Sequence, residues 1–185
     1  YSESFDCAAS GLPVLRPLVV DYQHDRTVHN IDDQFLCGRN ILVAPIMRED
    51  ATRTHYLPTG VWYDFFTKAS RSGGQWITED YSLNRLPVWL KGGSVIPLGP
   101  VVQSTSELTE ETPLELIALL DENDKASARI QLNRNRISDI SVERREDQYV
   151  ATIGNDFPLR RVRVFTPGGE ITEDNIVLKN SDRSS

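Results

Sequence analysis

The first twenty residues combine a helical pattern with a continuous apolar run. Residues 1–10 place apolar side chains on one helical face, and the Gly11-Leu-Pro sequence that follows is a common helix stop. Residues 13–20 are apolar except for Arg16, which predicts a strand buried on both faces, as in a parallel sheet. Pro17 indicates that a bulge or strand end falls inside this run. The start therefore predicts a helix that leads into one strand of an α/β unit.

Short runs rich in β-branched and aromatic residues replace this pattern in the rest of the chain. Turn sequences containing Gly, Pro and Ser separate them at spacings of roughly 8–12 residues, which is typical of a β-sandwich or barrel. The first set of predicted strands covers residues 41–46, 54–57, 61–66, 75–78, 88–90 and 95–98. The second set covers residues 114–120, 128–132, 137–143, 149–153, 162–166 and 176–178.

A polar segment separates the two sets of strands. Residues 103–113 are acidic and nearly free of large apolar side chains, so we interpret them as a solvated linker rather than a partner-binding site. The patterns together predict a mainly β protein with antiparallel β-sandwich domains after a short α/β start. We expect three parts: residues 1–33 as the end of an α/β domain, residues 34–110 as one β domain, and residues 111–185 as a smaller one.

Composition and charge narrow the class of protein further. The chain has 185 residues, of which 39% are hydrophobic and 25% charged, as in ordinary globular domains. No apolar run reaches the roughly 18 residues of a membrane span, so no membrane partner is expected. The net charge of -7 argues against a nucleic-acid partner, which usually requires a basic face. Met47 is the only methionine, so we expect residue 1 to be an internal position of a longer protein. The sequence does not assign a cellular location, although a cytoplasmic one is favoured.

Ordered motifs along residues 11–107 carry a resemblance to a known family. They are Gly11-Leu-Pro-Val-Leu-Arg-Pro-Leu18, Asp25, Asp33-Gln-Phe-Leu-Cys-Gly38, Ile41-Leu-Val-Ala-Pro-Ile46, Tyr56-Leu-Pro-Thr-Gly-Val-Trp-Tyr-Asp64, Leu86-Pro-Val-Trp-Leu-Lys-Gly-Gly-Ser-Val-Ile-Pro-Leu-Gly99 and Pro100-Val-Val-Gln-Ser-Thr-Ser-Glu107. The ordered set resembles glycoside hydrolase family 31, which includes α-glucosidases and α-xylosidases. Asp121-Glu-Asn-Asp124 lies where many members have a D-D-G-like turn, but it lacks the glycine. We therefore expect a shortened or diverged distal domain.

The resemblance implies a division of labour between this chain and a segment upstream of it. It implies that residues 1–33 end a catalytic (β/α)8 barrel, that residues 34–110 form the proximal C-terminal β-sandwich, and that residues 111–185 form the distal β domain. Retaining α-glycosidases use two carboxylates, of which one is the nucleophile and the other is the acid/base. The resemblance places both, with the family's sugar-binding residues, on the upstream barrel. No position here matches them, so we assign no catalytic residue, and we expect no metal and no cofactor.

Four aspartates after the predicted first strand are the local candidates for carboxylate chemistry. In a (β/α)8 barrel the loops after strands carry catalysis, so a carboxylate near a sugar site is one interpretation. Asp also favours turns and helix caps, and we favour that structural interpretation. The four residues are Asp21, Asp25, Asp32 and Asp33.

The histidines and cysteines match no common metal motif. The three histidines are His24, His29 and His55. Two metal ligands on one helical face would require histidines at positions 24 and 28, but position 28 is Val. Cys7 and Cys37 match neither a zinc spacing nor C-x-x-C, so we interpret them as buried free thiols rather than redox partners.

Arg16 and the three tryptophans have structural and functional interpretations. A buried Arg16 must be paired, and we expect a salt bridge to a carboxylate such as Asp25 or Asp33. Trp62 and Trp89 lie in predicted core strands, whereas Trp76 follows two glycines and is the tryptophan expected at the surface. Trp76 is therefore the only substrate-binding candidate.

The predicted function is an accessory one. We expect the chain to be the C-terminal accessory region of a retaining α-glycosidase that hydrolyses α-glucosidic or α-xylosidic bonds. Its partner is the upstream barrel of the same parent chain, through which it meets carbohydrate, and alone it is expected to be inactive. Two alternatives stay open: a carbohydrate-binding module that uses exposed aromatics, and an element through which the parent forms a homo-oligomer.

Overall fold

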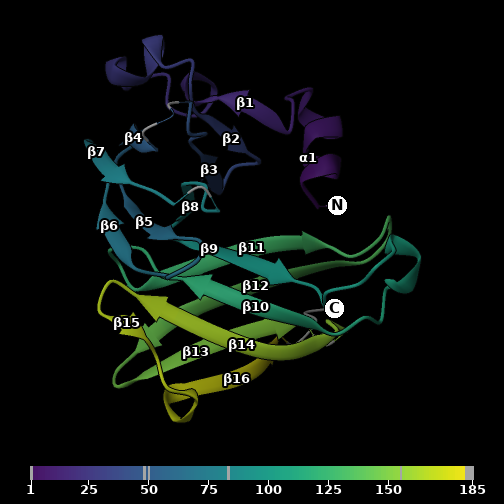
Figure 1. The fold of residues 1–185 in the computed structure, drawn as a ribbon. Helices are drawn as coiled ribbons and strands as arrows, with labels where there is room; N and C mark the ends of the chain where they lie inside the picture. The colour runs from purple at the N-terminus through teal and green to yellow at the C-terminus, as the bar shows by residue number, and fades with distance from the viewer. Residues whose placement is uncertain (1, 48, 50, 83, 155, 182–185) are drawn as a thin grey trace. The chain divides into compact units, whose positions relative to one another are not determined.

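A computed structural model describes residues 2–47, 49, 51–82, 84–154 and 156–181 of the chain (Figure 1). Strands dominate the described residues, which confirms the mainly β fold class. The chain forms two compact units, one covering Glu3–Gly92 and the other containing Ser2 and the chain from Gly93 onward. The three-part domain organisation stays a prediction. Among the described residues, no helix has both the length and the apolar character required to cross a bilayer.

The first unit begins with the predicted helix but not with the predicted strand. Helix α1 (Ser2–Ser10) ends before Gly11, whose φ of 74° lies in the left-handed region that glycine tolerates. Strand β1 (Leu15–Pro17) has only three residues and pairs antiparallel with its neighbour at the edge of a sheet. Pro17 has no N–H to donate, and the chain turns there into the 3-10 helix η1 (Leu18–Val20). The expectation of a strand buried on both faces is wrong, since Leu15 is 59% exposed.

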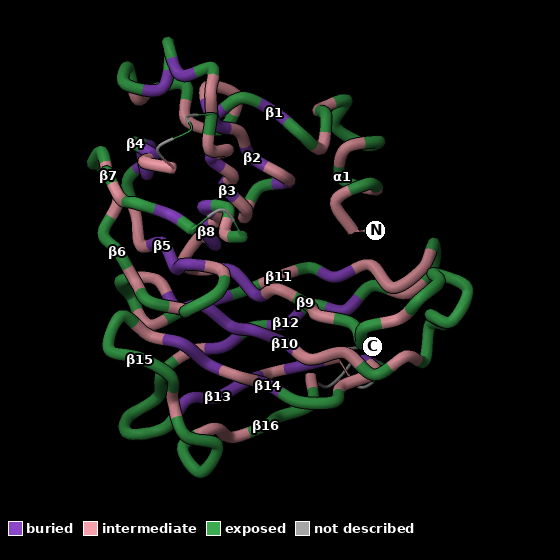
Figure 2. Tube along the Cα trace, viewed as in Figure 1, coloured by how far each residue is buried: buried purple, intermediate pink, exposed green. Residues whose placement is uncertain are grey.

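Two antiparallel sheets form the rest of the first unit. The larger has the order β1-β2-β3-β8-β5-β6, and the smaller pairs β4 with β7. The strands are β2 (Phe35–Cys37), β3 (Ile41–Val43), β4 (Thr52–Leu57), β5 (Val61–Asp64), β6 (Ser70–Ser72), β7 (Gln75–Asp80) and β8 (Val88–Lys91). A second 3-10 helix, η2 (Arg26–Asn30), precedes β2. Buried apolar side chains from η1, η2, β2, β3, β4, β5 and β8 share one core (Figure 2).

The motif that contains Pro58, Gly60 and Trp62 forms a compact turn between β4 and β5. The Trp62 indole N–H donates to the Pro58 carbonyl at 2.7 Å, and the Gly73 N–H donates to the Gly60 carbonyl at 2.6 Å. A Cβ atom at Gly73 would lie 1.8 Å from the Pro58 oxygen, so the position accepts only glycine without rearrangement. The turn before β5 and the turn before β7 therefore pack backbone against backbone.

The second unit is built on a single sheet with the order β15-β14-β10-β9-β11-β12-β13-β16. Antiparallel pairs are joined by parallel pairings of β10 with β14, β9 with β11, and β13 with β16. The strands are β9 (Ser94–Leu98), β10 (Leu114–Leu119), β11 (Lys125–Gln131), β12 (Ile137–Arg145), β13 (Gln148–Gly154), β14 (Leu159–Thr166), β15 (Gly169–Glu170) and β16 (Ile176–Ser181). Burial alternates along β12, as period-two patterning requires when one face meets a core (Figure 2).

The acidic segment at residues 103–113 connects β9 and β10, which are neighbours in this sheet. Its short 3-10 helix, η3 (Thr105–Glu107), is held by a capping box formed by Ser104 and Glu107. Most of its residues are exposed, as expected of a solvated segment. Its end is nevertheless anchored, because Glu110 accepts a hydrogen bond from Asn133 at 2.6 Å and Glu111 pairs with Arg136 at 2.8 Å.

Candidate functional site

Asp21, Asp25 and Asp33, which follow β1, each contact a different partner. Arg16, which is 2% exposed, donates through Nε to Asp21 Oδ2 at 2.7 Å and through Nη1 to the Pro13 carbonyl at 3.2 Å. Burial disfavours the charge, but the hydrogen bond and charge of Asp21 outweigh it and raise the pKa of the Arg16 guanidinium. Arg16 therefore forms the expected salt bridge to a carboxylate, but its partner is Asp21, five residues along the chain, and not Asp25 or Asp33.

Asp25 acts as a cap and as an acceptor for a tyrosine. Its Oδ1 accepts from the Thr27 N–H at 3.0 Å at the start of η2, which is the cap that its residue type predicts. Its Oδ2 accepts from the Tyr56 hydroxyl at 2.7 Å, and this hydrogen bond lowers the pKa of the Asp25 carboxyl.

Asp33 holds an arginine of β4. Arg53 donates through Nη1 to Asp33 Oδ2 at 2.5 Å and through Nη2 to the Asp33 carbonyl at 2.7 Å. The hydrogen bond from Arg53 lowers the pKa of the Asp33 carboxyl. The neighbouring Asp32 is exposed.

Gln34 completes the attachment of this segment to β4. Its side chain accepts from the Tyr56 N–H at 2.8 Å and donates to the Tyr56 carbonyl at 2.7 Å, so it pairs with the strand as another strand would. Gln34 is buried. Asp25, Asp33 and Gln34 therefore fix the position of β4, and the caps-and-turns interpretation of this acidic region agrees with their contacts.

The histidines occupy unrelated environments. His55 is fully buried on β4, with its ring centroid 5.8 Å from that of Trp89 and 6.4 Å from that of Tyr81. Burial, followed by the positive charge of Arg53, lowers the pKa of His55 to about 4. His29 Nε2 lies 3.0 Å from the Gln23 carbonyl oxygen at the surface. Across the described ranges, no group of three or more His, Cys, Asp or Glu side chains is arranged to hold a metal ion.

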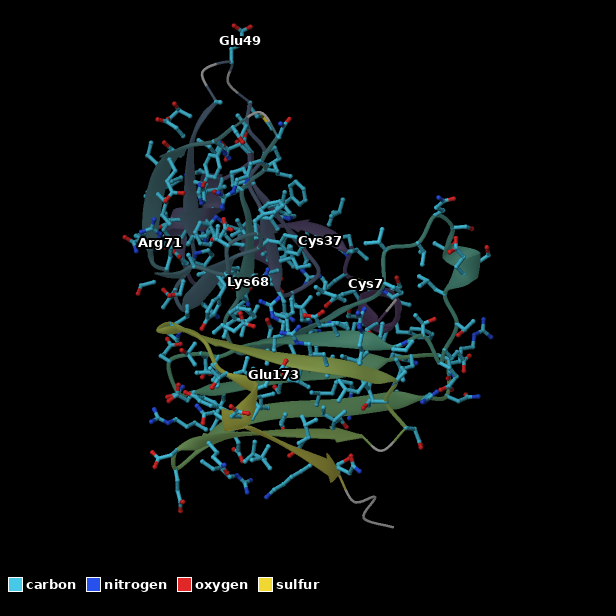
Figure 3. All side chains as sticks on the ribbon, turned by 60° about the horizontal axis from the view of Figure 1, so that its bottom comes forward. Cys7, Cys37, Glu49, Lys68, Arg71 and Glu173 are labelled. Atoms are coloured by element: carbon cyan, nitrogen blue, oxygen red, sulfur yellow. The ribbon has the colours of Figure 1, made fainter. Side chains whose placement is uncertain are left out.

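The tryptophans and cysteines divide largely as expected. Trp62 and Trp89 are buried, whereas Trp76 is 51% exposed on β7, with its ring centroid 5.3 Å from that of Tyr56. Cys7 and Cys37 are free thiols, but they are half-buried rather than buried (labelled in Figure 3).

One polar group of the quoted motifs has a role that its residue type alone did not reveal. Asp64, at the end of the Trp62-Tyr-Asp64 motif, is 5% exposed and accepts from the Phe66 N–H at 2.9 Å and the Thr67 N–H at 2.7 Å. Its other oxygen accepts from Arg85 at 2.6 Å. Although burial raises the pKa of this carboxyl, the hydrogen bonds from Thr67 and Arg85 lower it further than burial raises it. The signal in the sequence was a buried strand that ends in Asp before a turn.

The second unit contains a polar cavity of about 210 Å³ at one end of its sheet. It is lined by Arg136, Asp139 and Asp156 together with the apolar Phe157. Arg136 pairs with Glu111, and Asp139 pairs with Arg129 at 2.9 Å. Its charged groups thus have partners within the protein, and this arrangement supplies no separate nucleophile and base.

These contacts define a β-rich module whose charged side chains chiefly stabilise its own elements. Residues 11–96 match the family described as glycosyl hydrolase family 31 C-terminal domain. Over these residues the chain carries the C-terminal domain of glycoside hydrolase family 31.

Curated relatives and solved structures agree with this assignment. Alpha-glucosidase 2 of Bacillus thermoamyloliquefaciens is 43% identical over 112 residues, which are 60% of this chain and 14% of that protein. Human neutral alpha-glucosidase AB is 33% identical over 136 residues, which are 72% of this chain and 14% of that protein. The GH31 dextranase of Flavobacterium johnsoniae, solved with glucose, has a TM-score of 0.75 and 27% identity, covering 86% of this chain and 22% of that one. The chain therefore spans a small part of the proteins that it matches.

Proposed function

We propose that this chain is the C-terminal accessory region of a retaining α-glycosidase and that it supports an upstream (β/α)8 barrel. The observation that carries the proposal is the match of residues 11–96 to the family's C-terminal domain. The contacts described above support it, because Asp21, Asp25, Asp33 and Asp64 are all engaged in the protein's own hydrogen bonds. Retaining hydrolysis requires two carboxylates that face one substrate, which these residues do not provide.

The relatives favour α-glucosides as the substrate class of the parent protein. Several are named alpha-glucosidases, and the isomaltosyltransferase of Sporosarcina globispora, at 35% identity over 99 residues, indicates that transfer to a sugar is the alternative to hydrolysis. The α-xylosidase of Xanthomonas citri is 24% identical and shows a shared fold alone. We therefore propose glucosides ahead of xylosides.

The supporting role is tested by separating the two parts of the parent protein. The upstream barrel is expressed with and without this chain, and thermal unfolding of the barrel is followed together with hydrolysis of an aryl α-glucoside. We expect the barrel alone to unfold at a lower temperature and to regain stability when the chain is co-expressed. An equally stable and active barrel without this chain would refute the supporting role.

The two other candidate functions differ in support. Oligomerisation of the parent has no specific observation in its favour. Carbohydrate binding is favoured by one observation, which is the half-exposed ring of Trp76 on β7 beside the ring of Tyr56 on β4.

A further inference from the structure

The two-stranded sheet of the first unit presents a row of paired side chains on one face. The register of β4 with β7 places Tyr56 opposite Trp76, Thr54 opposite Thr78, and Thr52 opposite Asp80. The hydroxyl oxygens of Thr54 and Thr78 lie 2.8 Å apart, and the Thr52 hydroxyl donates to Asp80 at 2.7 Å. We call these six residues the Trp76 row.

Four of the six residues of the row are exposed, whereas Thr52 is half-buried and Tyr56 is 6% exposed, and the face opposite the row is buried. Trp76, Thr54, Thr78 and Asp80 are exposed, whereas Arg53 and His55, which alternate with the row on β4, are 7% and 0% exposed. Because successive side chains of a strand point to opposite faces, the row is the outward face of this sheet. Each step along it covers two residues, or roughly 6.6 Å, so the two steps between its three pairs form an elongated surface.

The aromatic end of the row is held in place before any ligand arrives. The ring of Trp76 packs on that of Tyr56, whose hydroxyl is fixed by Asp25 and whose backbone is fixed at both polar groups by Gln34. An ion pair of 2.8 Å between Arg71 of β6 and Glu79 secures β7 as well (Arg71 is labelled in Figure 3). A rigid aromatic surface loses little conformational entropy when it binds.

We propose that the Trp76 row is an auxiliary binding site for a short α-glucan chain. A pyranose ring has an apolar face of C–H groups, which packs on an aromatic ring, and a rim of hydroxyls, which require both donors and acceptors. Trp76 supplies the ring, the threonine hydroxyls donate and accept, and the Asp80 carboxylate accepts. The choice of an α-glucan among neutral oligosaccharides rests on the proposed function.

The composition of the row argues against a protein partner. Stable protein interfaces bury roughly 800 Å² on each side around an apolar centre. The row has a single large exposed apolar side chain, and every other exposed member is a hydroxyl or a carboxylate. One half-exposed ring flanked by hydrogen-bonding groups suits a small neutral ligand with hydroxyls.

Binding is tested by NMR titration of this chain with maltotriose and isomaltotriose. We expect millimolar binding, with shifts confined to residues 52–57 and 75–80 and to the Trp76 indole N–H. Sorbitol, which has hydroxyls but no pyranose face, serves as the control ligand and is expected to cause no such shifts. Shifts that are absent, or that sorbitol reproduces, would overturn the proposal.

Two substitutions separate stacking from a general loss of structure. Trp76→Ala is expected to weaken binding by about tenfold or more, and Trp76→Phe to restore part of it. The matched control is Phe66→Ala, since Phe66 is 53% exposed in the same unit but lies outside the row. The indole signals of the buried Trp62 and Trp89 report whether each variant remains folded. Equal weakening by Phe66→Ala and Trp76→Ala in folded proteins would overturn the proposal.

A second arm uses the protein extended upstream by its barrel. Trp76→Ala is expected to raise KM for a long α-glucan several-fold, whereas the control Phe66→Ala is expected to leave this KM unchanged. If the extended protein hydrolyses no aryl α-glucoside, the proposed function fails whatever the titration shows. If hydrolysis is seen but maltotriose and isomaltotriose do not bind the row, only this inference fails. An indole of Trp76 that the barrel shields from a soluble quencher would also overturn it.

Discussion

Tyr56 joins three parts of the first unit through different groups of one residue. Its hydroxyl binds Asp25, its backbone binds Gln34, and its ring packs on Trp76. Such contacts give the acidic region after β1 a structural role, since Asp25 and Asp33 accept hydrogen bonds from side chains of β4. The residue types indicated turns and caps, but the identity of the partner required the fold, as the pairing of Arg16 with Asp21 shows.

The neighbouring Asp32 and Asp33 provide a matched test of this role. Asp33→Asn removes the carboxylate that pairs with the buried Arg53. It is expected to lower the free energy of unfolding by about 2 kcal/mol. Asp32→Asn changes an exposed side chain and is expected to alter it by less than about 0.5 kcal/mol. Urea unfolding of both variants measures the difference, and equal effects would show that the contact with Arg53 contributes nothing.

His55 makes the stability of the first unit depend on pH. Its pKa of about 4 lies below the ordinary value of roughly 6.5, so the unfolded chain binds more protons between these two pH values. The contribution of neutral His55 to the free energy of unfolding is fully present above pH 6.5 and is lost as the pH falls towards 4. The loss is on the order of 3 kcal/mol.

The variant His55→Phe isolates this contribution from other titrating groups. It carries no titrating ring, so its free energy of unfolding is expected to vary less steeply than that of the wild type between pH 6.5 and 4. Urea unfolding at several pH values measures both slopes. Parallel profiles of the two proteins would contradict the assignment to His55.

At the scale of elements, the sequence patterns predicted most strands because their apolar positions alternate or run together. Strands β2 (Phe35–Cys37), β6 (Ser70–Ser72) and β15 (Gly169–Glu170) escaped prediction because two or three residues are too few to show a periodic pattern. The run at residues 13–20 was misinterpreted because apolar composition does not reveal where Pro17 ends the pairing. The row on β4 and β7 was not predictable, since it depends on the register between two strands that are far apart in sequence.

A departure from the family pattern also has a local explanation. The turn between β10 and β11 lacks the expected glycine, and Asp124 adopts the left-handed conformation with a φ of 56°. Asp121 stabilises the turn by accepting from the N–H groups of Asn123 and Lys125 at 2.9 and 3.0 Å. Aspartate tolerates this conformation better than most residues, so the turn forms without glycine.

Gly73 tests the packing of the two turns that border β4 and β7. In Gly73→Ala the new Cβ would collide with the Pro58 carbonyl, and we expect unfolding to become easier by about 2 kcal/mol or more. Gly99→Ala is the control, since its Cβ would meet only Leu114 at 3.8 Å, an ordinary contact. Urea unfolding compares the two variants. A Gly73→Ala protein as stable as the control would show that this turn packing is not required.

At the scale of the whole molecule, the exposed edge of β1 favours association between chains. The strand pairs with β2 on one side only, and Leu15 is 59% exposed on it. Unpaired edges with apolar side chains promote pairing with other chains, and a lysine on the edge opposes it. We expect the wild type to self-associate as its concentration rises and Leu15→Lys to do so less.

Sedimentation velocity over a range of concentrations measures this association. Val101→Lys is the control, because Val101 is fully exposed but lies outside the described strands. A wild-type chain that stays monomeric throughout, or an equal effect of the two lysines, would contradict a role for this edge.

The measurement that tests the accessory role most directly is hydrolysis of an aryl α-glucoside and an aryl α-xyloside. This 185-residue chain is assayed beside a version extended upstream by a complete barrel. We predict hydrolysis by the extended protein alone, with the glucoside preferred. Hydrolysis by the 185-residue chain itself would contradict the proposal, since its own carboxylates would then carry out the chemistry that we assign to the barrel.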